Sequence, residues 1–204
     1  MHSILILFAH PALERSRVNV RLAAAARDLP GVTFHDLYQR YPDFDIDVER
    51  EQELLENHDI VVMQHPFFWY STPALIKEWE DLVLQHGWAY GNGGTALAGK
   101  TMLNALTAGA PEEAYCRVGR NRYTVRELLA PLEQTALLCG MDYLPPFIVH
   151  ATYTLDAADI ERHAEDYRRV LEGLRDGVLD RDAVRDAVRL NADLELALPA
   201  IEER

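Results

Sequence analysis

The first segment with residues that could bind a ligand joins a short apolar run to a helix-like stretch. It carries His10, Ser16, Arg17, Val18 and Asn19 within the sequence AHPALERSRVN. Serine is a good helix N-cap, and the free backbone amides behind it form an anion site to which polar and cationic side chains add contacts. The segment therefore predicts a phosphate site. The alternative is that Ser16 only caps a helix and His10 only closes a turn.

The second segment is a cluster of aromatic side chains. His65 precedes Phe67, Phe68, Trp69 and Tyr70 in the sequence HPFFWYSTP, directly after the pattern of a buried strand. Aromatic residues beyond the end of a strand either cover the core or stack on a planar ligand. Core packing is the simpler interpretation for Phe67 or Phe68 alone. For the whole cluster, which a helix follows, we favour ligand binding.

The third segment combines small residues with a tyrosine, in the sequence LTAGAPEEAY. Thr107, Ala108, Gly109 and Ala110 allow the backbone to approach a ligand closely, and glycine adopts dihedral angles that other residues avoid. The Thr107 hydroxyl could hydrogen-bond to the edge of a ring. The Tyr115 phenol could stabilise charge on a reduced cofactor or substrate. Taken alone, Tyr115 would be interpreted as an ordinary surface tyrosine.

Several nucleotide and metal motifs are missing from the sequence. It contains neither the G-x-x-x-x-G-K-[ST] pattern of a P-loop nor the G-x-G-x-x-G pattern of a dinucleotide fold. Asp43, Asp45 and Asp47 alternate, but they lack the glycine and the distal glutamate of a calcium loop, so a solvated turn is favoured. The histidines show no metal-ligand spacing. We therefore predict no metal site.

Alternating strand and helix patterns separate these segments. Apolar runs predict strands at residues 3–9, 32–38, 60–64, 101–107 and 142–150, the last of them irregular because it contains two prolines. Amphipathic stretches predict helices at residues 15–29, 48–57, 73–83, 125–139 and 156–174. This alternation predicts an α/β fold with a doubly wound parallel sheet and helices on both faces. Ligands bind beyond the carboxyl ends of such strands, where the three segments meet.

Composition narrows the class of protein further. The 204 residues, 49% of them hydrophobic, can form a sizeable core, and the formal net charge of -13 argues against nonspecific nucleic-acid binding. No apolar run has the roughly 18 residues that a membrane span needs, and the early strand lacks the basic flank of a signal peptide. Cys116 and Cys139 are too few for a disulfide framework, which favours a reducing compartment.

The C-terminal stretch differs from the rest. We divide the chain into a domain at residues 1–175 and a helical extension at residues 176–204. Within the extension, apolar residues recur at the spacing of one amphipathic helix, namely Ala183, Ala187, Leu190, Leu194 and Leu198. The simpler interpretation is a terminal helix folded onto its own domain. The alternative is an arm that reaches a second subunit.

Several stretches carry a resemblance to a known family. They are AHP with SRVN, DLYQRYPDFDID, QHPFFWYSTPALIKEW, HGWAYGNGGTALAGK and CGMDYLPPF, and together they span nearly all of residues 4–175. The chain resembles the flavodoxin-like NAD(P)H:quinone oxidoreductases, and within them the KefF- and KefG-type ancillary proteins of glutathione-gated potassium efflux. The resemblance implies a flavodoxin-like five-stranded parallel sheet. It also implies a two-electron flavoenzyme that passes hydride from NAD(P)H to a quinone or similar electrophile.

The resemblance assigns roles to the three segments. The flavin is FMN in this branch and FAD in the larger quinone reductases. By their match to the family's motifs, His10 with residues 16–19 would hold the flavin phosphate, residues 67–70 would line the isoalloxazine ring, and residues 107–110 would contact its edge. Tyr115 matches a tyrosine that stabilises the charge of the reduced flavin.

The chain departs from the family pattern at three positions. Ala108 and Ala110 replace glycines, and each adds a methyl group near the expected ring. Asn121 stands where the family carries the histidine that accompanies its catalytic tyrosine. A relay between two side chains is therefore in question.

Partners and location also follow from the resemblance. It implies a cytoplasmic homodimer whose site lies at the two-fold interface, where residues 88–94 of one subunit approach the flavin of the other. It further implies a potassium-efflux antiporter as a membrane partner, with the protein at the cytoplasmic face of the inner membrane. The alternative to an enzyme is a regulatory subunit of a potassium/proton antiporter with little or no turnover.

Overall fold

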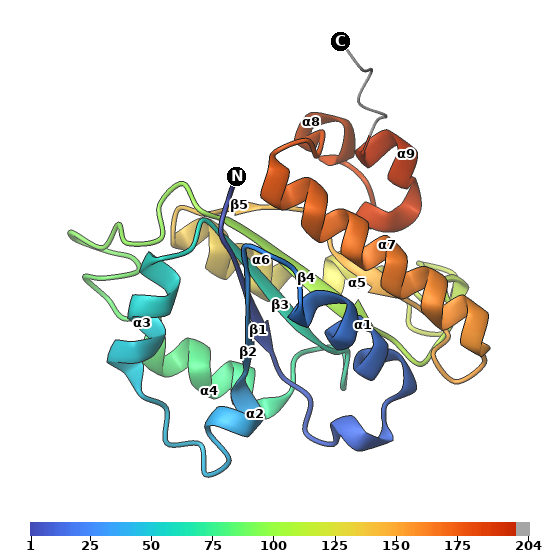
Figure 1. The fold of residues 1–204 in the computed structure, drawn as a ribbon, viewed down its shortest axis with the longest axis horizontal. Helices are drawn as coiled ribbons and strands as arrows, with labels where there is room; N and C mark the ends of the chain where they lie inside the picture. The colour runs from blue at the N-terminus through green and yellow to red at the C-terminus, as the bar shows by residue number, and fades with distance from the viewer. Residues whose placement is uncertain (199–204) are drawn as a thin grey trace.

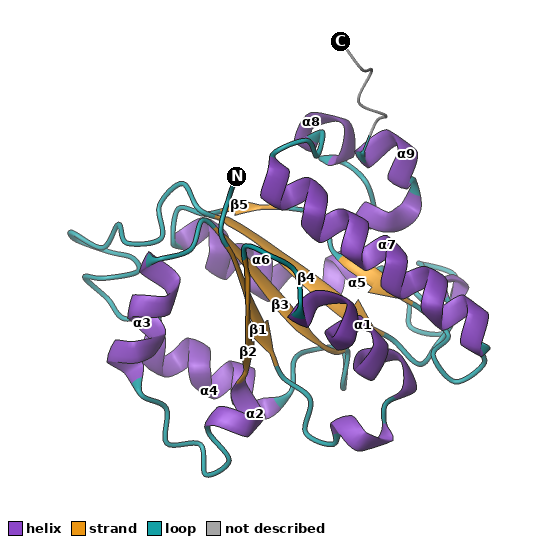
Figure 2. Ribbon diagram, viewed as in Figure 1, coloured by secondary structure: helices purple, strands orange, loops and turns teal. Residues whose placement is uncertain are grey.

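A single parallel sheet forms the centre of the molecule. The computed structural model describes residues 1–198, and Figure 2 shows the strands in orange between two layers of purple helices. The strands are β1 (Ile4–Phe8), β2 (Val32–Asp36), β3 (Ile60–Pro66), β4 (Thr101–Thr107), β5 (Asp142–Tyr143) and β6 (Phe147–Val149). Their order is β2-β1-β3-β4-β5, and β6 also pairs with β4. The doubly wound, flavodoxin-like sheet predicted from the sequence is confirmed.

Helices cover both faces of this sheet (Figure 1). The longer ones are α1 (Arg17–Arg27), α3 (Val48–Glu56), α4 (Ala74–Val83), α6 (Ala130–Leu138) and α7 (Ala157–Asp176). The short ones are α2 (Leu37–Arg40), α5 (Val125–Leu128), α8 (Arg181–Val184) and α9 (Leu194–Ala197), with 3-10 turns η1 (Leu13–Arg15), η2 (Glu112–Ala114) and η3 (Leu190–Ala192). Within residues 1–198, no helix combines the length and the apolar character that crossing a bilayer requires.

Strand β1 is apolar throughout because both of its faces are buried. Along β1, Ile4, Ile6 and Phe8 pack into the core beneath α1 and α7. Leu5 and Leu7 point to the opposite face, into the core beneath α3, α4 and α6. Side chains alternate across a strand, so a run without polar residues is what a doubly covered sheet needs.

Prolines interrupt two of the predicted elements. The expected strand at residues 142–150 is divided into β5 and β6 around Pro145 and Pro146, as expected for proline, which cannot donate a ladder hydrogen bond. The expected helix at residues 125–139 is also divided, into α5 and α6, with Pro131 in the first turn of α6. Proline fits a first turn but not a helix interior, so the helix restarts there.

The prediction of one continuous amphipathic helix in the C-terminal extension is wrong. The described part forms α8, η3 and α9, and its last predicted residues, 199–204, lie outside the described residues. Asp180 caps the first of these helices, and the pattern breaks because α8 ends at Val184 and Asp193 caps a new helix, α9, by accepting a hydrogen bond from Leu196 N. Val184, Leu190 and Ala197 are buried in the core of the same chain. This part therefore folds onto its own domain.

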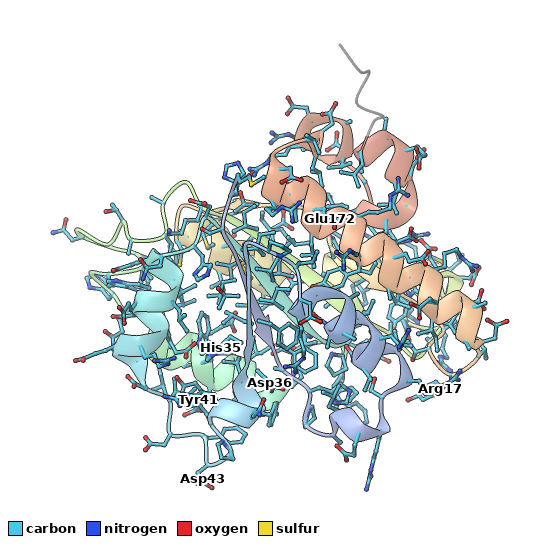
Figure 3. The ribbon with its side chains drawn as sticks, in the orientation of Figure 1. Arg17, His35, Asp36, Tyr41, Asp43 and Glu172 are labelled. Atoms are coloured by element: carbon cyan, nitrogen blue, oxygen red, sulfur yellow. The ribbon has the colours of Figure 1, made fainter. Side chains whose placement is uncertain are left out.

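A buried carboxylate network ties β2 to the helices on one face. Glu51 is fully buried and accepts hydrogen bonds from His35 Nε2 at 2.7 Å, Tyr41 Oη at 2.5 Å and Trp79 Nε1 at 2.8 Å. His35 and Tyr41 lie near each other on that side of the sheet (Figure 3). Burial alone raises the pKa of Glu51, but the hydrogen bond and charge of His35, with the Tyr41 and Trp79 bonds, hold it below its usual value. The network stabilises the face opposite α1.

Candidate functional site

Two adjoining hollows lie beyond the carboxyl ends of β1, β3, β4 and β6. The α1 hollow has a volume of about 490 Å³, and the Tyr115 hollow has a volume of about 450 Å³. The α1 hollow is lined by residues that include His10, Arg15, Ser16, Arg17, Val18, Asn19, Pro66, Phe67, Phe68, Thr107, Gly109, Thr152 and Tyr153. The Tyr115 hollow is lined by Phe67, Trp69, Tyr70, Gly109, Ala110, Pro111, Tyr115, Arg120, Asn121 and Tyr153. Phe67, Gly109 and Tyr153 line both, so the two hollows share a wall.

The N-terminus of α1 faces the first hollow. Ser16 is its N-cap, and Ser16 Oγ accepts from Asn19 N at 3.1 Å, which confirms the predicted cap. The amides of Arg17 and Val18 precede this bond and have no intrahelical acceptor. Val18 itself is a core residue with 2% exposure, so it offers the hollow its backbone and not its side chain. Free amides and the helix dipole favour an anion here.

Asn19 links the first segment to the third. Its Nδ2 donates to Thr107 Oγ1 at 2.8 Å and to Ser16 Oγ at 3.1 Å. Asn19 Oδ1 is buried and has no hydrogen-bond partner among the described residues. A buried acceptor without a donor is costly in a finished fold, so this oxygen is suited to a ligand hydroxyl or amide.

His10 and Arg17 contribute differently from one another. His10 Nδ1 accepts a hydrogen bond from Ala12 N at 3.1 Å, which requires the neutral ring. Burial lowers the pKa of His10 against opposing effects of Glu14 and Asp36, so the ring offers a hydrogen bond and no positive charge at neutral pH. Arg17 donates to Leu155 O at 3.0 Å at the rim of the hollow. Of His10 and Arg17, the two candidates for a positive charge at this site, Arg17 is therefore the one that supplies it.

The aromatic segment forms a strained turn. Phe68 and Ser71 make an antiparallel bridge, and Trp69 and Tyr70 between them have φ angles of 51° and 65°. Two successive non-glycine residues in the left-handed region cost on the order of 1 kcal/mol or more each. The turn leaves the Trp69 side chain 94% exposed. Such an arrangement presents aromatic surface at the mouth of the hollows.

The four aromatic residues do not act as one wall. Phe67 is 8% exposed and is also a member of the core cluster beneath the third segment, so packing and lining coincide there. Phe68 faces the α1 hollow, where its ring lies edge-on to His10 with centroids 6.0 Å apart. Trp69 and Tyr70 line the Tyr115 hollow, and Tyr70 Oη donates to Asn121 Oδ1 at 3.3 Å.

The third segment brings backbone and side chains to the junction of the hollows. Gly109 lies so close to Tyr153 that a Cβ at this position would stand 2.4 Å from Tyr153 Cε2. Ala110 lines the Tyr115 hollow. Ala108 departs from the expectation that its methyl group lies near a bound ring. Its side chain is 1% exposed and packs in the core, because the strand alternation turns it away from both hollows.

Tyr115 stands in the Tyr115 hollow beside two other rings. Its ring centroid lies 6.1 Å from that of Phe67 and 5.5 Å from that of His150. Burial raises the pKa of Tyr115, Tyr70 raises it further, and Arg120 lowers it. The phenol therefore stays protonated at neutral pH and is a hydrogen-bond donor. Asn121 lies in the same hollow, at the position where the sequence lacks the family histidine.

A fourth loop, after β6, was missed by sequence reasoning. Thr152 and Tyr153 line the hollows, and Thr152 N donates to Ala108 O at 3.2 Å. His150 begins this loop and packs against Tyr115. The signal was present, because the carboxyl end of the last strand lies at the same edge of the sheet as the others.

Charge and donor types fit a phosphate-bearing planar ligand better than a metal. Within residues 1–198, no group of three or more His, Cys, Asp or Glu side chains comes together as a metal site. The α1 amides, Arg17, the unpaired Asn19 oxygen and the aromatic turn instead provide an anion site, a polar middle and a flat apolar end.

Comparison with known proteins assigns the family. A family model described as a flavodoxin-like fold matches residues 2–171. The chain therefore belongs to this flavodoxin-like family.

Solved structures narrow the class, and the homologues among them include NAD(P)H:quinone oxidoreductases. A general stress protein 14 from Treponema denticola, in complex with FMN, is 42% identical with a TM-score of 0.80, over 84% of this chain and 99% of that one. An NADPH-quinone reductase from P. pentosaceus is 33% identical with a TM-score of 0.75, over 82% and 96%. A protein described as a thermophilic tryptophan halogenase from Streptomycin violaceusniger is 48% identical with a TM-score of 0.80, over 82% and 97%.

Proposed function

We propose that the protein is an FMN-dependent NAD(P)H:quinone oxidoreductase that transfers two electrons as hydride. The observation that carries this proposal is that the hollow with the anion site at α1 directly adjoins the hollow lined by the aromatic turn and Tyr115. The FMN complex and the quinone reductase among its relatives support the same cofactor and acceptor class. FMN fits better than FAD, because the anion site lies at one end of the cleft and needs only a terminal phosphate.

The end of the cleft at the N-terminus of α1 would hold the phosphate. The free amides of Arg17 and Val18 point from the helix end, Ser16 supplies a hydroxyl, and the Arg17 guanidinium lies at the rim. Asn19 Oδ1, unpaired and buried, is placed to accept from a hydroxyl between the phosphate and the ring. A chain with a formal net charge of -13 can bind an anion this way because local amides and one cation suffice.

The other end would hold the ring. Phe67 and Gly109 form the floor where the two hollows join, and Trp69 and Tyr70 stand at the side. These apolar walls exclude water from a planar ligand, while the backbone of the 107–110 segment supplies polar groups at its edge. Tyr153 now rests on Gly109, so it has to move for a ring to lie against that glycine.

When bound, FMN supplies the hydride chemistry, and the protein supplies orientation and electrostatics. Tyr115 keeps its proton at neutral pH and can donate a hydrogen bond to negative charge that develops in the cleft. Arg120 adds positive charge on the same side. A single open cleft serves NAD(P)H and the acceptor in turn, because each needs to reach the same ring.

Anaerobic spectroscopy of the purified holoprotein tests the proposal. NADPH or NADH should bleach the flavin absorbance, and a small benzoquinone should restore it with one quinone reduced per flavin. Mass spectrometry of the released flavin distinguishes FMN from FAD. Flavin that NAD(P)H fails to reduce would contradict the assignment.

The active assembly would be a homodimer. Residues 88–94 lie in the long connection between α4 and β4, and none of them lines the α1 hollow or the Tyr115 hollow of its own chain. We propose that in a two-fold pair they approach the partner's cleft, as the family resemblance implies. Trp88 Nε1 donates to Glu56 Oε1 at 2.8 Å, which fixes the base of this loop. Sedimentation equilibrium should give twice the chain mass, and a monomer with full activity would contradict the dimer.

A narrower proposal concerns potassium efflux. The long stretches QHPFFWYSTPALIKEW and HGWAYGNGGTALAGK support membership of the KefF- and KefG-type ancillary group. The alternative to turnover is a regulatory subunit of a potassium/proton antiporter. Co-purification with such an antiporter from detergent-solubilised membranes tests this, with and without FMN loaded. Binding by a protein that carries no flavin and reduces no quinone would favour the regulatory alternative.

A further inference from the structure

The segment after α7 runs along the open edge of the sheet and reaches the third site loop. We call residues 178–198 the C-terminal segment. The family match ends at residue 171, so this segment lies outside it. Figure 1 shows α8 and α9 beside the C-terminal half of α7. Its contacts join β6, η2 and α5, and the loops next to these elements carry Tyr115, Arg120, Asn121 and Tyr153, which line the Tyr115 hollow.

Asn191 completes the edge of β6. Its Oδ1 accepts from Ile148 N at 2.9 Å, and its Nδ2 donates to Ile148 O at 2.9 Å. Leu190 N donates to Pro146 O at 2.8 Å. One side-chain amide thus satisfies both backbone groups of a strand residue, in the way a neighbouring strand would. The segment is therefore fixed to the strand whose end carries His150 and the fourth loop.

Arg189 extends this attachment to the loop that carries Tyr115. Its Nε and Nη2 donate to the two carboxylate oxygens of Glu112 at 3.1 and 3.0 Å. The hydrogen bonds of Arg189 lower the pKa of Glu112, so the pair is ionised at neutral pH. Glu112 O in turn accepts from Tyr115 N at 2.9 Å. Two parallel hydrogen bonds, which form a fork, fix the orientation of the Glu112 carboxylate as well as its distance from Arg189.

Arg126 provides a second attachment on the far side of the same loop. Its Nη1 donates to Arg185 O at 3.0 Å and to Ala187 O at 2.8 Å. The stretch between Glu112 and Arg126 carries Tyr115, Arg120 and Asn121, all of which line the Tyr115 hollow. Both ends of this stretch are therefore held by one segment from outside the family match.

We infer that Arg189 is a positioning residue: through Glu112 it sets the place of Tyr115 and of the wall that faces the ring. This inference rests on the proposed function for its catalytic consequence. Its structural part, that the C-terminal segment orders residues 112–124, stands without it.

The test compares matched arginine variants of the full-length holoprotein. Arg189→Gln removes the fork, Arg189→Lys keeps the charge, and Glu112→Gln breaks the pair from the loop side. The control is Arg169→Gln, because Arg169 donates to Glu195 at 2.9 Å and joins α7 to α9 away from the cleft. Hydrogen-exchange mass spectrometry follows residues 109–124, and steady-state kinetics separate kcat from KM for quinone.

Arg189→Gln should speed exchange in residues 109–124 and lower kcat roughly tenfold, since small displacements of a reacting group are costly. Arg189→Lys should recover part of both effects, and the double variant with Glu112→Gln should add little. Arg169→Gln should change neither. Equal exchange in Arg189→Gln and wild type would overturn the inference. Faster exchange in a protein without quinone reduction would support the ordering role and contradict the proposed function instead.

Discussion

Asn19 Nδ2 and Thr107 Oγ1 lie 2.8 Å apart and join the start of α1 to the end of β4, 88 residues along the chain. The bond holds the proposed phosphate end of the cleft at a fixed distance from the proposed ring edge. It also orients the Asn19 oxygen that has no partner among the described residues. The buried side-chain amide of Asn19 therefore connects the first and third site segments directly.

Replacing Asn19 by alanine should therefore weaken FMN binding. Two hydrogen bonds and one ligand contact disappear, which corresponds to roughly a tenfold rise in Kd and about 1–2 kcal/mol of unfolding free energy. Quenching of FMN fluorescence gives the Kd, and urea denaturation gives the stability. Asn57→Ala, at an exposed position at the end of α3, is the matched control for the Kd. An unchanged Kd in Asn19→Ala would show that this amide is structural only.

Tyr115→Phe should slow reduction of the bound flavin and leave FMN affinity near wild type. The substitution keeps the ring contacts with Phe67 and His150 but removes the donor, and loss of one such donor costs roughly 10- to 100-fold in rate. Stopped-flow mixing with NADPH measures the rate. Tyr123→Phe, an exposed residue nearby, is the control. Because the pKa of Tyr115 is raised, its titration should leave the rate flat below about pH 10.

Glu51→Gln should destabilise the fold most at neutral pH. The folded-state pKa of Glu51 lies below its unfolded value, so its ionised form contributes stability above the unfolded pKa that is lost as pH falls through the folded pKa. Gln cannot accept all the present bonds, and the loss should be about 3 kcal/mol at pH 7. Chemical denaturation from pH 3 to pH 8 measures the difference in unfolding free energy between wild type and variant. Glu53→Gln, at an exposed position, is the control. A difference that grows on acidification would contradict this sign.

Replacing Glu80 by glutamine should instead stabilise the fold at pH 8. Burial raises the pKa of Glu80 to about 7, Lys77 opposes the shift and Asp81 adds to it, and Glu80 Oε1 has no partner among the described residues. The folded state therefore holds this proton more tightly, and stability is lost as pH rises from the unfolded pKa through 7. Gln should raise stability at pH 8 by roughly 2 kcal/mol and change little at pH 4. Exposed Glu78→Gln is the control.

The sheet was predictable because burial on two faces leaves a simple signal. The run that forms β1 is apolar throughout, and those that form β3 and β4 are mostly apolar, with Gln64, His65 and Asn104 as buried polar exceptions. The Ser16 cap was predictable for a similar reason, since its hydrogen bond spans only three residues. Local chemistry and tertiary packing agree at these positions, and sequence patterns suffice there.

Other features depend on contacts that the sequence does not reveal. The C-terminal extension has the spacing of one helix, yet capping by Asp180 and Asp193 and pairing of Asn191 with Ile148 divide it. Ala108, the residue directly after β4, points into the core. Tyr153 reaches the cleft only because the fourth loop folds over Gly109. Each of these features depends on tertiary contacts between segments that are distant in the sequence.

The most direct test of the central claim is a crystal structure of the protein grown with FMN. The account predicts phosphate density at the N-terminus of α1 near Ser16 and ring density against Phe67 and Gly109, with Tyr153 moved from its present place. Crystals in which Tyr153 still covers Gly109, and in which no FMN density lies in either hollow, would contradict the account.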